Sequence, residues 1–278
     1  MKTLITVVLY NKELVQSKTL VSICSCKYTD ADLVIYNNGP HNVDANNFIF
    51  RTLENKFISV KIVNDVNNKP LSMIYNSAII NNPEADRFVF LDDDTILSDF
   101  YFNGISNTQV DLIVPIIKEK NSPYYPLVNG LPCDKFKNVD LSFETLFSIG
   151  SGLVIYRTLV NKFCIYNLSP FDERFALYGV DFSFFRRLQF LSNNGETINI
   201  IINGMLEHSL SRNEGFISEE RHVERLIDVV LSAKFYSKSL WIDIYTMMKV
   251  IAREIKHLRF HHALFALKIY LRGKHPRC

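Results

Sequence analysis

The chain has 278 residues, of which 47% are hydrophobic, 13% aromatic and 22% charged, and its net charge is +2. This length and composition predict one large domain or two small ones, and they exclude a disordered, collagenous or low-complexity chain. No apolar run approaches the ~18–20 residues that a membrane-spanning helix needs. Five scattered cysteines favour reduced thiols in a cytosolic protein.

The charge is distributed unevenly along the chain. Residues 234–278 carry ten Lys and Arg against two acids, a local charge of +8, so the rest of the chain carries −6. Four of the seven histidines also lie in this tail. A weakly acidic body with a basic tail predicts an anionic partner for the tail.

The first half of the chain alternates between strand and helix patterns. Buried or half-buried strands are predicted over 4–9, 32–36, 58–63, 87–91 and 111–115. Between them, residues 12–25 and the apolar positions from Leu71 to Ile79 have helical spacing, and Pro70 opens the second of these helices. This order predicts βαβ units and a mostly parallel sheet.

The second half is less regular at first and then helical. Residues 118–147 are predicted to be loop-like, 150–156 a small-residue turn that leads into a strand, 181–191 a helix and 197–202 a short strand. Apolar stripes at helical spacing then predict three helices within 223–231, 240–255 and 260–271. We expect the domain boundary near residues 210–218.

Three consecutive aspartates, Asp92 to Asp94, follow the apolar strand at 87–91. In an open parallel sheet the carboxyl ends of the strands face the ligand crevice. Adjacent carboxylates repel one another, and a divalent cation such as Mg²⁺ or Mn²⁺ relieves that repulsion while it binds a phosphate-bearing substrate. The alternative is a solvated turn in which Asp92 or Asp94 caps the next helix. The cluster alone leaves both interpretations open.

Several segments, in chain order, resemble the motifs of the GT-A glycosyltransferases of family 2. Residues 90–95 (FLDDDT) are similar to the D-x-D signature, and residues 8–11 (VLYN) resemble the first-strand motif. Residues 34–39 resemble the second-strand motif, with Asn37 where the family usually has Asp. The similarity continues through 67–76, the turn at 150–152 and the segment 170–187, in which Val180 and Ser183 replace acids.

The resemblance covers about residues 1–215 and implies the fold and the reaction. It implies an α/β GT-A domain over 1–215, with a mostly parallel sheet flanked by helices, followed by a basic amphipathic helical region over 216–278. It also implies an inverting, metal-dependent transfer of a sugar from a UDP- or dTDP-sugar to a hydroxyl of a saccharide acceptor. The Val180–Asp181 pair is similar to bacterial rhamnosyltransferase-like members, which implies a role in surface polysaccharide (O-antigen or capsule) synthesis.

The resemblance also implies roles for individual residues. Asp181 is the candidate general base, with a helix N-cap as the alternative or additional role, and Asp94 and His208 are the candidate ligands of Mn²⁺ or Mg²⁺. For His208 the alternative is an ordinary surface or core histidine. The nucleotide-sugar is expected to contact Tyr10, Asn11, Asn37, Asn67, Asp92 and Asp93. The acceptor is expected to contact Gly150, Ser151, Gly152, Asp172 and Glu173.

The basic tail has several possible partners. Amphipathic helices with this charge are expected to lie on an anionic membrane surface, which suits a polyprenyl-diphosphate-linked acceptor and a cytoplasmic location at the inner face of a bacterial membrane. The alternatives are a helical subdomain that packs on the core and a homodimer. No nucleic-acid-binding motif is present in the sequence.

Two other functions are compatible with parts of the sequence. A phosphoryl-transfer enzyme of the haloacid dehalogenase type uses a similar acidic motif, although here Ile96 stands where Thr or Val belongs and three strands precede the motif. A non-catalytic sugar-nucleotide-binding module would account for the losses at Val180 and Ser183.

Overall fold

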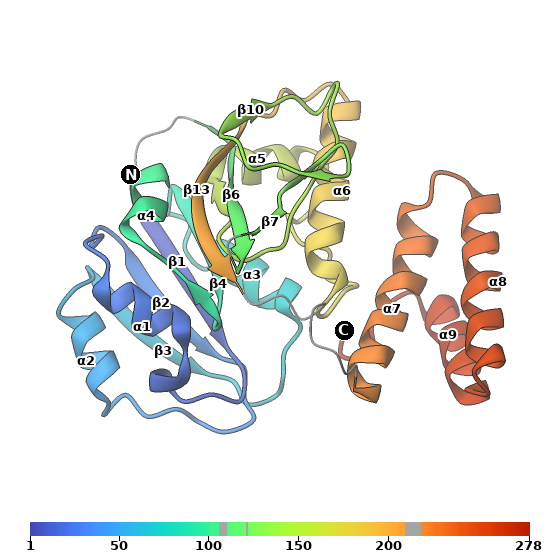
Figure 1. Ribbon diagram of the computed structural model, residues 1–278, viewed down its shortest axis with the longest axis horizontal. Helices are drawn as coiled ribbons and strands as arrows, with labels where there is room; N and C mark the ends of the chain where they lie inside the picture. The colour runs from blue at the N-terminus through green and yellow to red at the C-terminus, as the bar shows by residue number, and fades with distance from the viewer. Residues whose placement is uncertain (106–109, 121, 209–217) are drawn as a thin grey trace.

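The computed structural model describes residues 1–105, 110–120, 122–208 and 218–278 (Figure 1). The expected domain boundary, at 210–218, falls almost entirely on residues outside these ranges. Within them, a mixed sheet with helices on both faces precedes three C-terminal helices, as the sequence predicts.

The central sheet follows the order β10-β13-β6-β12-β4-β1-β2-β3, with β5 paired to β13 and β7 to β6. Neighbours β1 to β4, β1 to β2, β2 to β3 and β13 to β6 run parallel, whereas β12, β10, β5 and β7 pair in the antiparallel sense. The bounds are β1 Thr3–Leu9, β2 Asp32–Asn37, β3 Ser59–Asn64, β4 Arg87–Asp92, β5 Thr95–Ile96, β6 Leu112–Glu119, β7 Ser122–Tyr125, β10 Lys137–Val139, β12 Val154–Tyr156 and β13 Ile200–His208.

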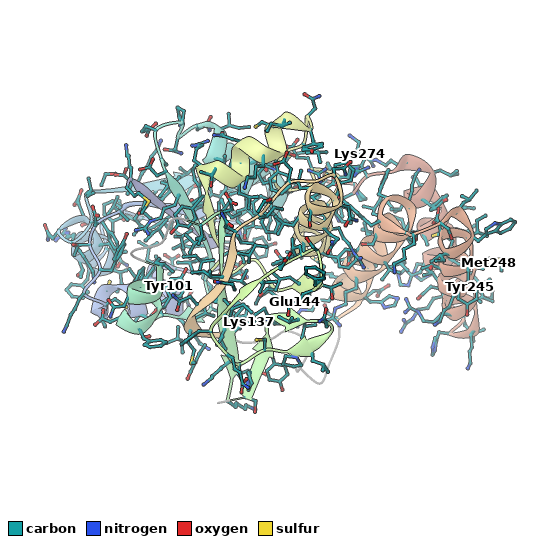
Figure 2. All side chains as sticks on the ribbon, turned by 90° about the horizontal axis from the view of Figure 1, so that it is seen from above. Tyr101, Lys137, Glu144, Tyr245, Met248 and Lys274 are labelled. Atoms are coloured by element: carbon teal, nitrogen blue, oxygen red, sulfur yellow. The ribbon has the colours of Figure 1, made fainter. Side chains whose placement is uncertain are left out.

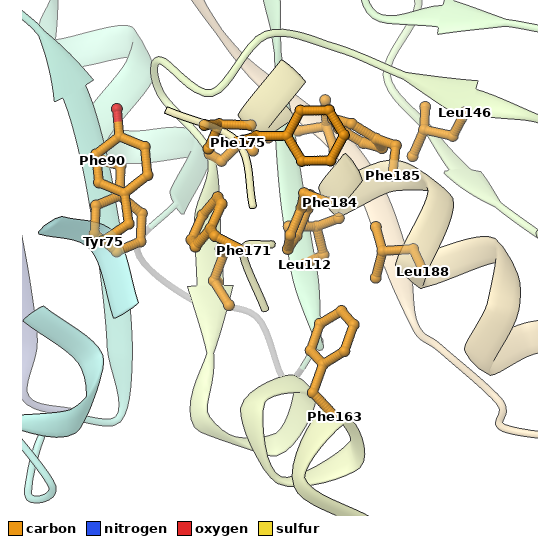
Figure 3. Packing of buried hydrophobic residues seen from close by; sticks show 14 of the residues in the cluster. Tyr75, Phe90, Leu112, Leu146, Phe163, Phe171, Phe175, Phe184, Phe185 and Leu188 are labelled. Atoms are coloured by element: carbon orange, nitrogen blue, oxygen red, sulfur yellow. The ribbon is translucent and has the colours of Figure 1, made fainter. Parts of the chain in front are cut away.

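Both faces of this sheet are buried beneath helices. Helices α3, α5, α6 and α7 contribute to one apolar cluster, whose aromatic part is shown in Figure 3, and α1, α2 and α4 contribute to the other. Strand β1 supplies Leu4 and Val8 to the first cluster and Ile5 and Val7 to the second, which explains its continuously apolar sequence. The helix bounds are α1 Lys18–Ser25, α2 Phe48–Glu54, α3 Leu71–Ile80, α4 Asp99–Ile105, α5 Arg157–Ile165, α6 Gly179–Asn193 and α7 Glu219–Tyr236.

The predicted strands in the first half are confirmed, each within two residues at its ends except that β6 extends to Glu119. The helix predicted over 12–25 is divided: a 3-10 turn, η1 Leu14–Gln16, precedes α1, because Ser17 ends the turn and its hydroxyl caps α1 at the Leu20 N–H. The expectation of a loop over 118–147 is wrong. That segment forms β7 and β10 and a small sheet of β8 Leu127–Val128, β9 Leu131–Pro132 and β11 Leu146–Phe147.

Strand β13 is longer than predicted and carries a bulge. Ile202 pairs with Val114 and Met205 with Ile116, so β13 has one extra residue between these two pairs. Gly204 has a φ of +79° there, a conformation that favours glycine. Beyond the bulge, β13 continues to His208, which pairs with Thr95 of β5.

The C-terminal helices are α7, α8 Leu240–Lys256 and α9 Phe260–Arg272. Helix α7 lies beside the end of α6, and α8 and α9 pack on α7 (Figure 1). Helix α7 joins the core through Leu226, Ile227 and Val230. The chain then returns to the loop between β3 and α3, where Arg277 donates to the Asn68 side chain at 2.7 Å. In the described ranges no helix is long and apolar enough to cross a membrane.

Candidate active site

The acidic turn lies at the end of β4, beside the end of β13. The pairing of β13 with β5 places His208 next to this turn. Its Nδ1 is 3.3 Å from Asp94 Oδ1, and its Nε2 is 3.8 Å from Asp92 Oδ2. Ligand atoms of these three residues lie within 4.8 Å of one another. The structure therefore brings together the predicted residues Asp92, Asp94 and His208.

A chain of hydrogen bonds beneath the turn holds this group in place. The Asp92 N–H donates to Ser151 Oγ at 3.0 Å, Ser151 Oγ is 2.6 Å from Thr95 Oγ1, and Thr95 Oγ1 is 2.9 Å from His208 Nδ1. Ser151 and Thr95 are both fully buried. Ser151 thus supports the acidic turn and Thr95 orients the imidazole, while the acceptor contact expected of Ser151 stays a prediction.

The charge state of Asp92 reflects its surroundings. Burial and, to a smaller extent, the Asp94 and Asp93 carboxylates raise its pKa to about 6, while His208 and Lys12 oppose the rise. The buried hydroxyl of Tyr75, on α3, interacts with both Asp92 and Asp181, and burial raises its own pKa well above the usual range. Tyr75 therefore stays protonated between two carboxylates.

Asp181 projects from the first turn of α6. A backbone hydrogen bond from Gly150 holds its carboxylate, yet burial and then the Asp92 charge raise the pKa of Asp181 to about 8. A cavity of about 540 Å³ is lined by Asp181, Gly150, His208 and the acidic turn. The candidate base and the candidate metal ligands therefore share one cavity.

The middle aspartate of the turn, Asp93, contacts the segment that follows β1. Lys12 Nζ is 2.5 Å from Asp93 Oδ1, and the Tyr10 N–H donates to Asp93 Oδ2 at 3.2 Å. A smaller cavity of about 240 Å³ lies on the other side of Lys12 and is lined by Asn11, Lys12, Glu13, Gln16, Gly39, His41 and Val43. The two segments expected to contact a nucleoside, at 8–11 and 34–39, therefore meet at this cavity.

Three predicted nucleotide contacts, Tyr10, Asn37 and Asn67, line neither cavity. Asn37 is buried, its amide donates to the His41 carbonyl and to Asn64 Oδ1, and its own oxygen accepts the Gly39 N–H. Asn67 is exposed, and its side chain donates to Asp65 at 2.9 Å. In this arrangement Asn37 shapes the loop that lines the smaller cavity. Direct contact with the nucleotide stays a prediction for all three residues.

Four predicted acceptor contacts, Ser151, Gly152, Asp172 and Glu173, do not line the large cavity. Asp172 is 1% exposed and is held by Arg174, by Arg187 at 3.2 Å and by the Tyr236 hydroxyl at 2.6 Å. Glu173 is exposed and accepts from Asn76 at 3.0 Å. Asp172 joins α7 to the segment before α6 in this structure. An acceptor contact stays a prediction for all four residues.

The cavity has one wall that the sequence did not predict. Arg225, Asp228 and Val229 of α7 line it together with Tyr178, and the Arg225 guanidinium lies 5.4 Å from the centre of the Tyr178 ring. The Asp228 charge contributes to the raised pKa of Asp181. Helix α7 belongs to the predicted C-terminal region, so that region takes part in the site.

The donor set at the acidic turn suits a hard divalent cation. Two carboxylates and an imidazole are ligands that Mn²⁺ accepts. Burial and the two neighbouring carboxylates disfavour the charged form of Asp92, and a bound cation would favour it. The residues present therefore fit the cation that the resemblance implies.

Neither a family model nor a curated protein matches the chain. Solved structures do match its fold. S. aureus TarS 1-349 in complex with UDP-GlcNAc superposes with a TM-score of 0.55 at 14% identity, over 100% of this chain and 82% of TarS 1-349. The match to a longer S. aureus TarS structure covers 43% of that TarS chain.

Two further structures extend this likeness. The mannosyltransferase PcManGT from Pyrobaculum calidifontis, in complex with GDP-Man and Mn²⁺, matches with a TM-score of 0.53 at 11% identity, over 99% of this chain and 76% of its own. GalNAc-T7 with UDP, GalNAc and Mn²⁺ matches with a TM-score of 0.51 at 14% identity, over 84% of this chain and 49% of the GalNAc-T7 chain. At these identities the comparisons establish the GT-A type α/β fold.

Proposed function

We propose that this protein is a metal-dependent glycosyltransferase that moves a sugar from a nucleoside diphosphate to a hydroxyl group, with inversion at the anomeric carbon. The observation that carries the proposal is the shared cavity of about 540 Å³, in which Asp181 faces the group formed by Asp92, Asp94 and His208. The GT-A type fold, which matched structures solved with nucleotide-sugars also have, supports it.

The proposed reaction is a single displacement. The acceptor oxygen forms a bond to the anomeric carbon while the bond from that carbon to the diphosphate oxygen breaks, and the hydroxyl proton passes to Asp181. A general base of this kind contributes about 10²–10⁴-fold to the rate. A divalent cation held by Asp92, Asp94 and His208 would neutralise the charge that develops on the diphosphate.

The donor is proposed to extend from the small cavity to the large one. Asn11, Gly39 and His41 would surround the nucleoside, which we propose to be uridine or thymidine. Lys12 and Asp93 lie where the two cavities approach. Arg225 and Tyr178 then face the space left for a saccharide acceptor.

A panel of UDP-, dTDP- and GDP-sugars tests the donor site. Thermal shift with and without Mn²⁺ should show stabilisation by one nucleotide class only when the metal is present, and Asp94→Asn should abolish that shift. Indifference to every nucleotide would contradict the proposal. A shift that does not need the metal would contradict the role of Asp92, Asp94 and His208.

Turnover separates an enzyme from a binding module. Asp181→Asn removes the proton acceptor with little change in volume, so the rate should fall about 10²–10⁴-fold while the nucleotide-dependent thermal shift remains. Full activity in this variant would exclude Asp181 as the base. A phosphatase assay with generic phosphate esters covers the phosphoryl-transfer alternative, and we expect no turnover there.

We also propose that α8 and α9 dock on an anionic membrane surface that presents a lipid-linked acceptor. These helices expose the large apolar or aromatic side chains of Trp241, Tyr245, Met248, Leu264 and Leu271. Figure 2 labels Tyr245 and Met248 at the edge of the molecule. The local charge of +8 complements an anionic surface. Co-sedimentation should show binding to vesicles that contain phosphatidylglycerol and none to pure phosphatidylcholine. Dimerisation in solution without vesicle binding would overturn this assignment.

A further inference from the structure

A second cluster of metal-ligating side chains lies among the three C-terminal helices, away from the candidate active site. Helix α7 contributes His222, α8 contributes Glu254 and α9 contributes His262. His222 Nε2 is 2.9 Å from Glu254 Oε2, and His262 Nδ1 is 3.7 Å from the same oxygen. One atom from each residue lies within 4.8 Å of the other two.

The cluster contains a buried nitrogen that lacks a partner. His262 is 5% exposed, and its Nδ1 makes no hydrogen bond with any group in the described part of the chain. Buried polar atoms of this kind are uncommon, and an ion or water that completes their bonding is a usual explanation. The unpartnered nitrogen faces Glu254, whose side chain is 1% exposed.

Two arginines and one further carboxylate surround the cluster. Arg253 engages the other oxygen of Glu254, Oε1, at 3.1 Å. Arg259 Nη1 is 3.2 Å from His222 Nε2 and 3.9 Å from Glu254 Oε2, but its side chain is 46% exposed and can turn towards solvent. On the outer side, Glu219 Oε1 lies 3.6 Å from the second ring nitrogen of His262. A carboxylate near that second nitrogen is typical of ligating histidines.

We propose that His222 Nε2, Glu254 Oε2 and His262 Nδ1 form a zinc site that joins α7, α8 and α9. Two imidazoles and one carboxylate are ligands that Zn²⁺ prefers. Zinc bonds of ~2.0–2.2 Å place neighbouring ligand atoms of a tetrahedral site roughly 3.3–3.6 Å apart, and the two distances given above lie on either side of that range. Since His222 precedes Arg225 by one helical turn, the ion would also fix the part of α7 that lines the active-site cavity.

Zinc titration of the full chain tests the site. The Asp94→Asn background weakens the other candidate metal site, and the protein is first treated with a chelator. We expect one equivalent of Zn²⁺ by calorimetry, a rise in Tm, and a visible absorption band when Co²⁺ replaces Zn²⁺. His262→Gln and His222→Gln should each weaken Zn²⁺ binding at least about 100-fold, because even outer partners of a metal site contribute 10–100-fold.

Two matched variants make the result specific. His257→Gln alters an exposed histidine at the end of α8, outside the cluster, and should leave the zinc affinity unchanged. Arg259→Ala removes the competing cation and should tighten zinc binding. Absence of a bound equivalent in the Asp94→Asn background would overturn the proposal. So would an affinity that neither His222→Gln nor His262→Gln changes, since His222 is only half-buried and its variant should fold even where His262→Gln does not.

Discussion

The Asp181 carboxylate lies against the backbone of Gly150, so closely that a Cβ atom at position 150 would be 2.5 Å from Asp181 Oδ1. Gly150 and Asp181 belong to different parts of the chain, the turn before β12 and the first turn of α6. Only a residue without a side chain allows this approach. The placement of the candidate base therefore depends on Gly150.

Gly150→Ala should displace Asp181 and reduce turnover about 10²-fold, because a shift of ~1 Å in a catalytic group has an effect of that size. Nucleotide-dependent thermal shift should remain. The control is Gly130→Ala, where the added methyl meets open space but the φ of +80° is strained; it should cost about 1 kcal/mol of stability and no activity. Native turnover in Gly150→Ala would refute this dependence.

The raised pKa of Asp181 predicts a pH dependence of stability. The folded-state pKa of about 8 lies above the ordinary value of 3.8, so the folded protein binds this proton more tightly than the unfolded chain does. The stability that Asp181 contributes is complete below about pH 4 and is lost as the pH rises through about 8.

Asp181→Asn cannot ionise, so its stability relative to the native protein should increase between pH 5 and pH 8. We expect an increase of about 2 kcal/mol in the absence of metal, less than the full conversion of the shift because the side chain is partly exposed. Urea unfolding at the two pH values measures it. Asp134→Asn, at an exposed loop position, should show no such trend, and a flat difference for Asp181→Asn would contradict the assignment.

Thr95 is predicted to act on the metal site through His208. Thr95→Val removes the hydroxyl that lies 2.9 Å from His208 Nδ1 while it keeps the shape of the side chain. The concentration of Mn²⁺ needed for nucleotide-dependent stabilisation should rise about 10–100-fold. Thr52→Val, whose hydroxyl donates to the Phe48 carbonyl on α2, is the control and should leave the Mn²⁺ dependence unchanged.

A Tyr236→Phe variant should show how much the hydrogen bond between α7 and Asp172 contributes to stability. Burial opposes ionisation of Asp172, but Arg174, Arg187 and the Tyr236 hydroxyl together lower the pKa of Asp172. Tyr236→Phe removes a hydrogen bond to this buried charge and should cost about 1.5–3 kcal/mol of unfolding free energy. Tyr245→Phe, at an exposed position on α8, should cost almost nothing. Equal effects of the two variants would argue against this contribution.

Much of the fold was predictable because its strands are apolar and its helices periodic. The continuous apolar run of β1 and the stripes of α7, α8 and α9 both reflect burial, which sequence patterns report directly. Helices α2, α4 and α5 were not predicted. Each has seven to nine residues, so too few turns exist to establish a period.

The site residues that belong to sequence motifs were predictable, whereas the residues that only packing brings to the site were not. Asp92, Asp94, Asp181 and His208 were predicted, and the structure places them around one cavity. Tyr75 was missed because its position on α3 also fits the apolar stripe, and only the fold brings its hydroxyl to the carboxylates. The roles of Thr95, Arg225 and Asp228 were missed because tertiary contacts alone bring Thr95 to His208 and the two α7 side chains to the cavity.

The extra residue in β13 has a consequence for how this chain can change. Because two residues of β13 oppose one residue of β6 at the bulge, deleting Asn203 or Gly204 would restore a regular strand in which Met205 to His208 keep their present partners. Beyond the bulge the spacing is strict, since successive side chains of a strand point to opposite sides of the sheet. A residue inserted or removed between Met205 and His208 would turn His208 away from the acidic turn even though no functional side chain had been replaced. We therefore expect homologous chains with the same chemistry to vary in length at the bulge and to keep the number of residues from Met205 to His208.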